Sequence, residues 1–212
     1  MKKIIFEKGF FHVFTKSIAD YIIFRSDEDY RRMLELFKFY MFERKNSFSN
    51  YWRMPDNKKE LEYKGKKIVK IIAYCLMPTH IHLIISNEIE KGIVLFMKNL
   101  LDSYSKYFNL KVKRKGPLWE SRYKTVLVET DEQLLHLTRY IHLNPVTAYL
   151  INKPEEWKFS SYLEYLGEIN DREKISEYEE FLEINPKDYK IFVENRISYQ
   201  RELNKIKKLT FE

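Results

Sequence analysis

Two apolar, β-branched runs separated by only three residues impose the strongest constraint on how this chain folds. The first run extends from Ile68 to Leu76, the second extends from His80 to Ser86, and Met77-Pro78-Thr79 connects them. Runs of this length and composition are typical of β-strands. A connection this short joins antiparallel neighbours. The sequence therefore predicts an antiparallel hairpin in the middle of the chain.

Further strand and helix patterns flank this hairpin. Strand patterns cover 10–15 and 123–129, and helical spacing of apolar residues covers 27–41, 93–108 and 131–143. The last helix is expected to stop before Pro145. The order β-α-β-β-α-β with a trailing helix predicts an α+β fold, a ferredoxin-like split-βαβ sandwich with a central antiparallel sheet. One sheet face should pack on the two helices, and the other should stay accessible.

Two segments depart from this pattern. Residues 43–66 are polar and contain Pro55, which predicts a long loop or insertion. The chain after 165 is highly charged with sparse apolar residues, which predicts one or two peripheral helices. We therefore expect one domain over 1–165, with an insertion at about 43–66, and a charged helical C-terminal extension over 166–212.

Charge and cysteine content narrow the class of protein. Lys and Arg number 38 against 31 Asp and Glu, for a net charge of +7. Such an excess attracts polyanions such as nucleic acid, although a Lys-rich proteome explains it equally well. Cys75 is the only cysteine, so no disulfide can form within the chain. The apolar run that begins at Met1 ends at Glu7-Lys8, and no later run is long enough to cross a membrane. We expect a cytoplasmic protein, nucleoid-associated when bound to DNA, with no membrane partner.

Two histidines begin the second strand of the hairpin. Side chains alternate along a strand, so His80 and His82 project from one face. Two imidazoles two residues apart on one face can bind a single metal ion. The spacing alone more often describes two polar residues on a solvated strand face.

A second cluster lies on the trailing helix. His136, Tyr140 and Asn144 follow one another at intervals of four residues and so form one stripe. A tyrosine nucleophile beside a metal site can attack a phosphodiester. The chain has 16 tyrosines, most of which must pack in the core, and Asn144 before Pro145 is also an ordinary helix-terminating residue.

The third signal is basic and aromatic. Cations that can contact phosphates surround a tryptophan that can stack on a base, which suits single-stranded or hairpin nucleic acid. A lysine-rich surface loop has the same composition. The residues of this predicted DNA-binding segment are Lys111, Lys113, Arg114, Lys115, Trp119, Arg122 and Lys124.

Four segments, taken together, resemble the single-tyrosine HUH endonucleases and transposases of the IS200-like type. They are YCLMPTHIHLII at 74–85, GPLWESRYK at 116–124, RYIHLNPVTA at 139–148 and WKFSSY at 157–162. Phe11-His12-Val13 is similar to the first strand of this family. The REP-associated tyrosine transposases, which act on DNA hairpins of repetitive extragenic palindromes, are the most similar branch. The resemblance covers about 9–165 and implies the same ferredoxin-like fold, called the HUH domain.

The resemblance implies a mechanism and a set of site residues. His80, His82 and Asn144 bind a divalent cation, Mg²⁺ or Mn²⁺, and Tyr140 attacks the scissile phosphate of single-stranded DNA. The products are a 5′-phosphotyrosine link and a free 3′-hydroxyl, whose return attack rejoins strands. Arg139, in the block that holds Tyr140, joins the predicted DNA contacts. Family members include monomers and homodimers, and both stay open.

Three departures from the family pattern leave the predicted catalytic residues untouched. Thr147 replaces an arginine common after N-P-V, the 43–66 segment is long, and the tail after 165 is only loosely similar. We expect a competent nicking and joining enzyme. One alternative is a non-catalytic, domesticated hairpin-binding protein, and another is an RNA-binding ferredoxin-like module with surface aromatics.

Overall fold

The computed structural model describes residues 9–44, 46–55 and 65–210. The apolar run at Met1, residues 45 and 56–64 of the predicted insertion, and the last two residues of the predicted extension lie outside the described residues. Among the described residues, no helix combines the length and apolar character needed to cross a membrane.

The central sheet has four antiparallel strands in the order β2-β3-β1-β4. The strands are β1 (Phe10–Lys16), β2 (Val69–Met77), β3 (His80–Asn87) and β4 (Lys124–Val128). The hairpin β2-β3 is therefore the predicted one, and β1 lies between β3 and β4. This order is that of a split-βαβ sandwich. The predicted fold class is confirmed.

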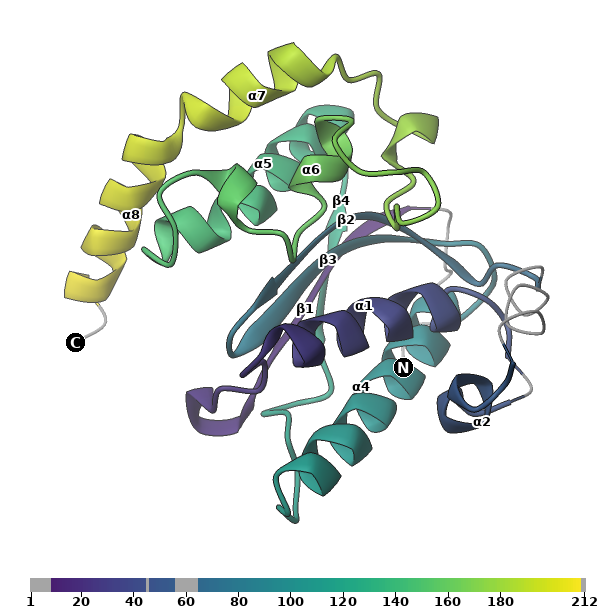
Figure 1. Cartoon of the computed structure of the whole chain (residues 1–212). Coiled ribbons are helices and arrows are strands. Elements are labelled where there is room, and N and C mark those ends of the chain that lie inside the picture. Colours follow the sequence, from purple (N-terminus) through teal and green to yellow (C-terminus); the bar gives the residue numbers. More distant parts are fainter. Residues whose placement is uncertain (1–8, 45, 56–64, 211–212) are drawn as a thin grey trace, which may run out of the picture.

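Two helices cover one face of the sheet, as predicted. These are α1 (Asp27–Tyr40) and α4 (Gly92–Lys111), which lie side by side in Figure 1. Their apolar stripes, with Phe37 and Phe96 among the fully buried residues, pack against inward-facing strand residues such as Leu83. Ser26 caps α1 together with Asp29, whose carboxylate accepts hydrogen bonds from the backbone N–H groups of Arg25 and Ser26.

The opposite face is not left accessible, in contrast to the prediction. Helix α5 (Asp131–Thr147) packs on β2 and β3, and the chain after it adds α6 (Tyr162–Tyr165), α7 (Pro186–Glu194) and α8 (Ile197–Thr210) on the same side (Figure 1). A second core forms there, in which strand residues such as Cys75 and Ile84 meet Ile141 of α5 and Tyr189 of α7. The physical reason is that β2 and β3 are apolar on both faces, so each face must be covered.

Helix α5 continues through Pro145, whereas the sequence predicted that it ends at Leu143. A proline has no N–H to donate to the carbonyl four residues earlier, here that of Ile141. The side-chain amide of Asn144 donates to this carbonyl at 3.4 Å and to that of Tyr140 at 3.0 Å. Asn144 thus supplies the hydrogen bond that the proline cannot make, and the helix persists to Thr147.

The described parts of the predicted insertion and extension are partly ordered into helices. The insertion contains α2 (Phe48–Trp52), whose Phe48 and Tyr51 are buried against Phe39. The extension contributes α7, α8 and buried residues such as Val193 to the second core. The helices expected after 165 are therefore present, while the domain division at 165 stays a prediction.

Candidate functional site

The two histidines of β3 lie on the face that α5 covers. His80 pairs with Met77 and Lys16, and His82 pairs with Cys75 and Phe14. The two rings are 5.1 Å apart between centroids. The alternation of the strand therefore places both imidazoles on one face, as predicted from the sequence.

Tyr140 lies beside these histidines. Its ring stands edge-on to that of His82, with centroids 5.9 Å apart, and to that of His12 at 6.3 Å. The side chain is 37% exposed, and burial of the rest raises the pKa of its phenol. Residues from β1, β3 and α5, far apart in the sequence, thus meet at one place. His136 of the same stripe instead packs against Phe192 of α7, with ring centroids 5.7 Å apart.

Asn144 lies one turn after Tyr140 on α5. Its side-chain NH₂ group is held by the backbone carbonyls of Tyr140 and Ile141. The amide oxygen is therefore the atom of Asn144 that is left to bind a ligand.

His12 is a site residue that the sequence did not single out. Its Nε2 lies 3.1 Å from Nδ1 of His82, and the two rings stack with centroids 5.3 Å apart. The signal that could have found it is the alternation of β1, which places Phe10, His12 and Phe14 on one face. His12 is the diagonal neighbour of His82 across the β1–β3 pair, because Phe14 is the direct partner of His82.

In both β3 imidazoles Nδ1 contacts a protein group, which leaves Nε2 for a ligand. The Thr79 hydroxyl lies 3.0 Å from Nδ1 of His80, just as His12 engages Nδ1 of His82. No protein group in the described part of the chain bonds to either Nε2. Burial lowers the pKa of His80 to about 4 and that of His82 well below its usual value, so both rings are neutral at pH 7.

This donor set fits a divalent cation. Neutral imidazoles with a free Nε2 are metal ligands, and their Nδ1 atoms carry the supporting contacts that metal-binding histidines usually have. The amide oxygen of Asn144, one turn along α5 from Tyr140, is a hard ligand of the kind that Mg²⁺ and Mn²⁺ accept and would be the third protein ligand. Within the described residues no group of three His, Cys, Asp or Glu side chains could hold a metal. Water or substrate would therefore have to complete the coordination sphere.

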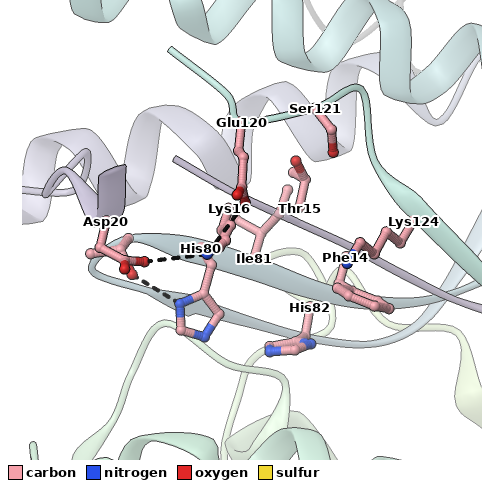
Figure 2. A pocket seen from close by; sticks show the side chains of 11 residues that line it. Phe14, Thr15, Lys16, Asp20, His80, Ile81, His82, Glu120, Ser121 and Lys124 are labelled. Atoms are coloured by element: carbon pink, nitrogen blue, oxygen red, sulfur yellow. Dashed lines mark hydrogen bonds and ion pairs between the residues drawn. The ribbon is translucent and has the colours of Figure 1, made fainter. Parts of the chain in front are cut away.

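A pocket of about 280 Å³ adjoins the histidines (Figure 2). It lies between β1, the start of β3 and the segment that precedes β4. Its lining residues are Phe14, Thr15, Lys16, Asp20, Thr79, His80, Ile81, His82, Glu120, Ser121 and Lys124.

The predicted DNA-binding residues divide into two groups. Three of them have partners within the chain. Lys111 pairs with the buried Asp29 at 2.7 Å, and Arg114 donates to the carbonyl of Pro117 at 2.6 Å. The indole N–H of Trp119 donates to the carbonyl of Leu101 at 3.3 Å. The other four of the basic segment are exposed. They are Lys113, Lys115, Arg122 and Lys124, and none has an ion-pair partner among the described residues.

Lys124 and Arg139 differ in position from the rest of the predicted DNA contacts. Lys124 lines the histidine pocket, 6.0 Å above the ring of Phe14. Arg139 precedes Tyr140 on α5, and its guanidinium stacks on Phe192 of α7 at 4.1 Å. The structure therefore brings Lys124 to the pocket and packs Arg139 against the tail.

Comparisons with known proteins found a matching family model, a similar sequence and a similar solved structure. Residues 39–144 match the family model described as "Transposase IS200 like", and this segment contains His80, His82, Tyr140 and Asn144. A protein of Haemophilus influenzae, named as a REP-associated tyrosine transposase of putative status, is 27% identical over 101 residues, which are 43% of this chain. The matched region spans 57% of that relative.

One solved structure is also similar. It is described as a REP-associated tyrosine transposase bound to a REP hairpin. The likeness has a TM-score of 0.49 at 15% identity and covers 76% of this chain and 82% of that one. The family match, by contrast, spans half of the chain and includes both β3 histidines and the α5 tyrosine. The chain belongs to the IS200-like transposase family.

Proposed function

We propose that this protein is a metal-dependent transposase and endonuclease that binds DNA hairpins. It nicks single-stranded DNA through a 5′-phosphotyrosine intermediate and rejoins strands. Membership of a transposase family supports DNA processing in general, and the finer mechanism rests on the site geometry.

The position of Tyr140 carries the proposal. Its ring stands edge-on to His82 from a different element of the fold, and the rest of the ring reaches solvent. A tyrosine that served only packing would not need to stay partly exposed beside the neutral imidazole of His82. A nucleophile must be both accessible to substrate and next to the groups that bind the reacting phosphate.

Three side chains would hold the cation. They are His80 and His82 through Nε2 and Asn144 through its amide oxygen, while Thr79 and His12 orient the imidazoles through Nδ1. In this arrangement His12 accepts the Nδ1 proton of His82. When bound, the cation withdraws charge from the scissile phosphate and orients it.

The covalent step balances without an external reactant. The phenol oxygen of Tyr140 forms a bond to the phosphorus, and the bond from phosphorus to the 3′ oxygen breaks. The 3′ oxygen keeps the electron pair and gains a proton, while the phenol loses one. Attack of a 3′-hydroxyl on the phosphotyrosine reverses every change, so strands rejoin at no net bond cost.

The hairpin substrate is supported by the exposed cations that have no ion-pair partner among the described residues. Lys113, Lys115 and Arg122 are free to meet phosphates, and Lys124 lies where DNA would enter the site. The named REP-associated relative supports the same class of substrate. Association of this kind weakens with salt, because phosphate contacts release counterions.

The test is Tyr140→Phe, with Tyr199→Phe as the matched control because Tyr199 is an exposed tyrosine of α8. A DNA hairpin with single-stranded flanks carries a fluorophore at its 3′ end, so a 5′-phosphotyrosine link transfers the label to the protein on a denaturing gel. We expect label transfer by wild type and Tyr199→Phe with Mg²⁺ or Mn²⁺, and none by Tyr140→Phe or after chelation of the metal. Hairpin affinity, measured by anisotropy, should stay within about twofold.

Two outcomes would change the proposal. Label transfer by Tyr140→Phe would remove Tyr140 from its role. Tight hairpin binding by wild type with no label transfer under any metal would assign the protein to the non-catalytic hairpin-binding class instead.

A further inference from the structure

The segment before β4 leaves a gap beside β1. The last β1–β4 pair joins Phe14 to Lys124, and an isolated bridge then joins Ser17 to Trp119. Between these two points β1 has two residues, whereas the facing segment has four, 120–123. The longer segment must bow away from the strand, and the histidine pocket of about 280 Å³ lies in the opening.

This pocket joins the two faces of the sheet. Phe14 and Lys124 belong to the face that carries His80 and His82, whereas Thr15 and Ile81 belong to the opposite face. Figure 2 shows Thr15 and Ser121 on one side of β1 and the two histidines on the other. A group inserted into the gap would therefore extend from the catalytic side into the sheet.

The pocket contains a hydroxyl that the protein leaves unsatisfied. Thr15 is only 4% exposed, and its Oγ1 has no hydrogen-bond partner among the described residues. A buried polar atom without a partner destabilises the fold, so natural proteins usually satisfy it. Ser121 lines the same pocket and offers a second hydroxyl from the bowed segment. Hydroxyls both donate and accept, which suits the mixed edge of a nucleobase.

The charges at one end of the pocket disfavour a phosphate there. Lys16 is already paired with Glu120 at 3.3 Å and lies 3.9 Å from Asp20. A phosphate beside Lys16 would meet two carboxylates, whereas Lys124, which also lines the pocket, can hold a phosphate outside this end. An uncharged base avoids that repulsion, and its ring can lie against the apolar side chains of Ile81 and Phe14.

We propose that the pocket binds the base of a nucleotide that flanks the scissile phosphate, and that Thr15 and Ser121 read its hydrogen-bonding edge. This inference rests on the proposed nicking activity and gives that site a means of choosing its substrate. His80 and His82 line the same pocket, so a base seated there is joined to a phosphate beside the candidate metal ligands. Enzymes that act on a base place it in a pocket and read its edge by hydrogen bonds, and an unpaired flank can present a base in the same way.

The experiment uses a pool of synthetic DNA hairpins with one stem and randomised ten-nucleotide flanks. The full chain carrying Tyr140→Phe selects from the pool, and sequencing of the bound fraction gives the base preference at each flank position. The nicked position is mapped separately with the unsubstituted tyrosine. Thr15→Val and Ser121→Ala are then compared with Thr125→Val, which removes a hydroxyl from an exposed β4 residue outside the pocket.

We expect that, in Thr15→Val, the ratio of preferred to other bases at one flank position next to the nick falls about tenfold. This is the effect of losing one buried hydrogen bond. Ser121→Ala should lower the same preference less, and Thr125→Val should leave it unchanged. Unchanged preferences in Thr15→Val, or an equal decline at every position, would overturn the proposal. If thermal unfolding shows that Thr15→Val does not fold, the exposed Ser121→Ala decides alone.

The outcomes also separate this inference from the function on which it rests. Hairpin selection and label transfer without any base preference beside the nick would remove the base pocket and leave the nicking activity intact. If the chain that carries only Tyr140→Phe selects no hairpin, both the base pocket and the proposed hairpin-nicking function are rejected.

Discussion

His12 determines which nitrogen His82 can offer to a ligand. Because Nε2 of His12 lies 3.1 Å from Nδ1 of His82, it fixes the orientation of the neighbouring ring. Supporting contacts of this kind commonly change metal affinity ten- to hundredfold. The residue therefore belongs to the candidate site as a positioning residue for His82.

We predict that His12→Ala weakens Mn²⁺ binding about tenfold. His12→Gln should recover part of the affinity, because its side-chain oxygen can accept the same hydrogen bond. Calorimetric titration of Mn²⁺ into each folded variant measures the effect without any turnover. Equal affinities for wild type and His12→Ala would show that His82 needs no support from β1.

Lys111 and Lys115 look alike in the sequence but have different surroundings. Lys111 donates to the carboxylate of Asp29, whose side chain is almost wholly buried, and this contact helps to hold the pKa of Asp29 below its usual value. Lys115 is exposed in the basic loop. The two lysines should therefore serve folding and DNA binding, respectively.

We predict that Lys111→Met lowers the free energy of unfolding by about 2 kcal/mol, because it removes a charged hydrogen-bond partner from a buried carboxylate. Lys115→Met should leave stability unchanged and weaken hairpin binding at low salt. Urea unfolding and fluorescence anisotropy measure the two effects. A stable Lys111→Met variant with weakened DNA binding would reverse this assignment.

At the scale of elements, the sequence predicts the strands and the long helices to within a few residues. Alternating or helical spacing and a capping residue determine these boundaries locally. It fails at α5, where the rule that helices end before proline gives Leu143 and the helix reaches Thr147. The side chain of Asn144 supplies the missing backbone contact, and nothing in the spacing of residues shows that orientation in advance.

Helix α8 holds the C-terminal end of α5. The guanidinium of Arg201 donates to the carbonyls of Val146 and Ile151, both at 3.2 Å, and Asn204 donates to that of Thr147 at 3.0 Å. These carbonyls belong to the end of a helix and the turn after it, where intrahelical partners run out. The tail thereby fixes the helix that carries Tyr140.

We predict that Arg201→Gln lowers the free energy of unfolding by about 1–2 kcal/mol, since two carbonyls lose a charged donor. It should also slow formation of the covalent adduct, because α5 is less firmly placed. Arg196→Gln is the control, since this exposed arginine stacks on Tyr199. Urea unfolding and label transfer are the measurements. Equal unfolding free energies and equal rates of adduct formation in the two variants would contradict the role given to α8.

The whole molecule depends on contacts that no local pattern reveals. His142 of α5 shows this, because its two ring nitrogens lie 2.7 Å from the hydroxyls of Ser161 and Tyr189 and so connect three segments. Both histidines lie in segments that resemble the family, but the sequence predicts no role for either. Both depend on which elements lie against each other, whereas His80 and His82 were found because a single strand carries both.

We predict a loss of stability in acid that depends on His142. Burial lowers its pKa from 6.5 to about 3, so below pH 6.5 the unfolded chain binds a proton that the folded chain does not. Between pH 7.5 and 5, wild type should therefore lose about 2 kcal/mol more of its unfolding free energy than His142→Gln. Urea unfolding with a chelator at both pH values tests this, and parallel losses would show that His142 is protonated in the fold.

The bowed segment 120–123 has a consequence for how such proteins diversify. Its two ends are tied to β1, at Glu120 through a backbone hydrogen bond to Lys16 and at Lys124 through the last β1–β4 pair. Residues 121–123 can therefore change in length or composition while the sheet keeps its register. Selection could therefore alter target choice here without rebuilding the scaffold. For the same reason, exchanging residues 121–123 between family members is the simplest way to alter the base preference that we propose for this pocket.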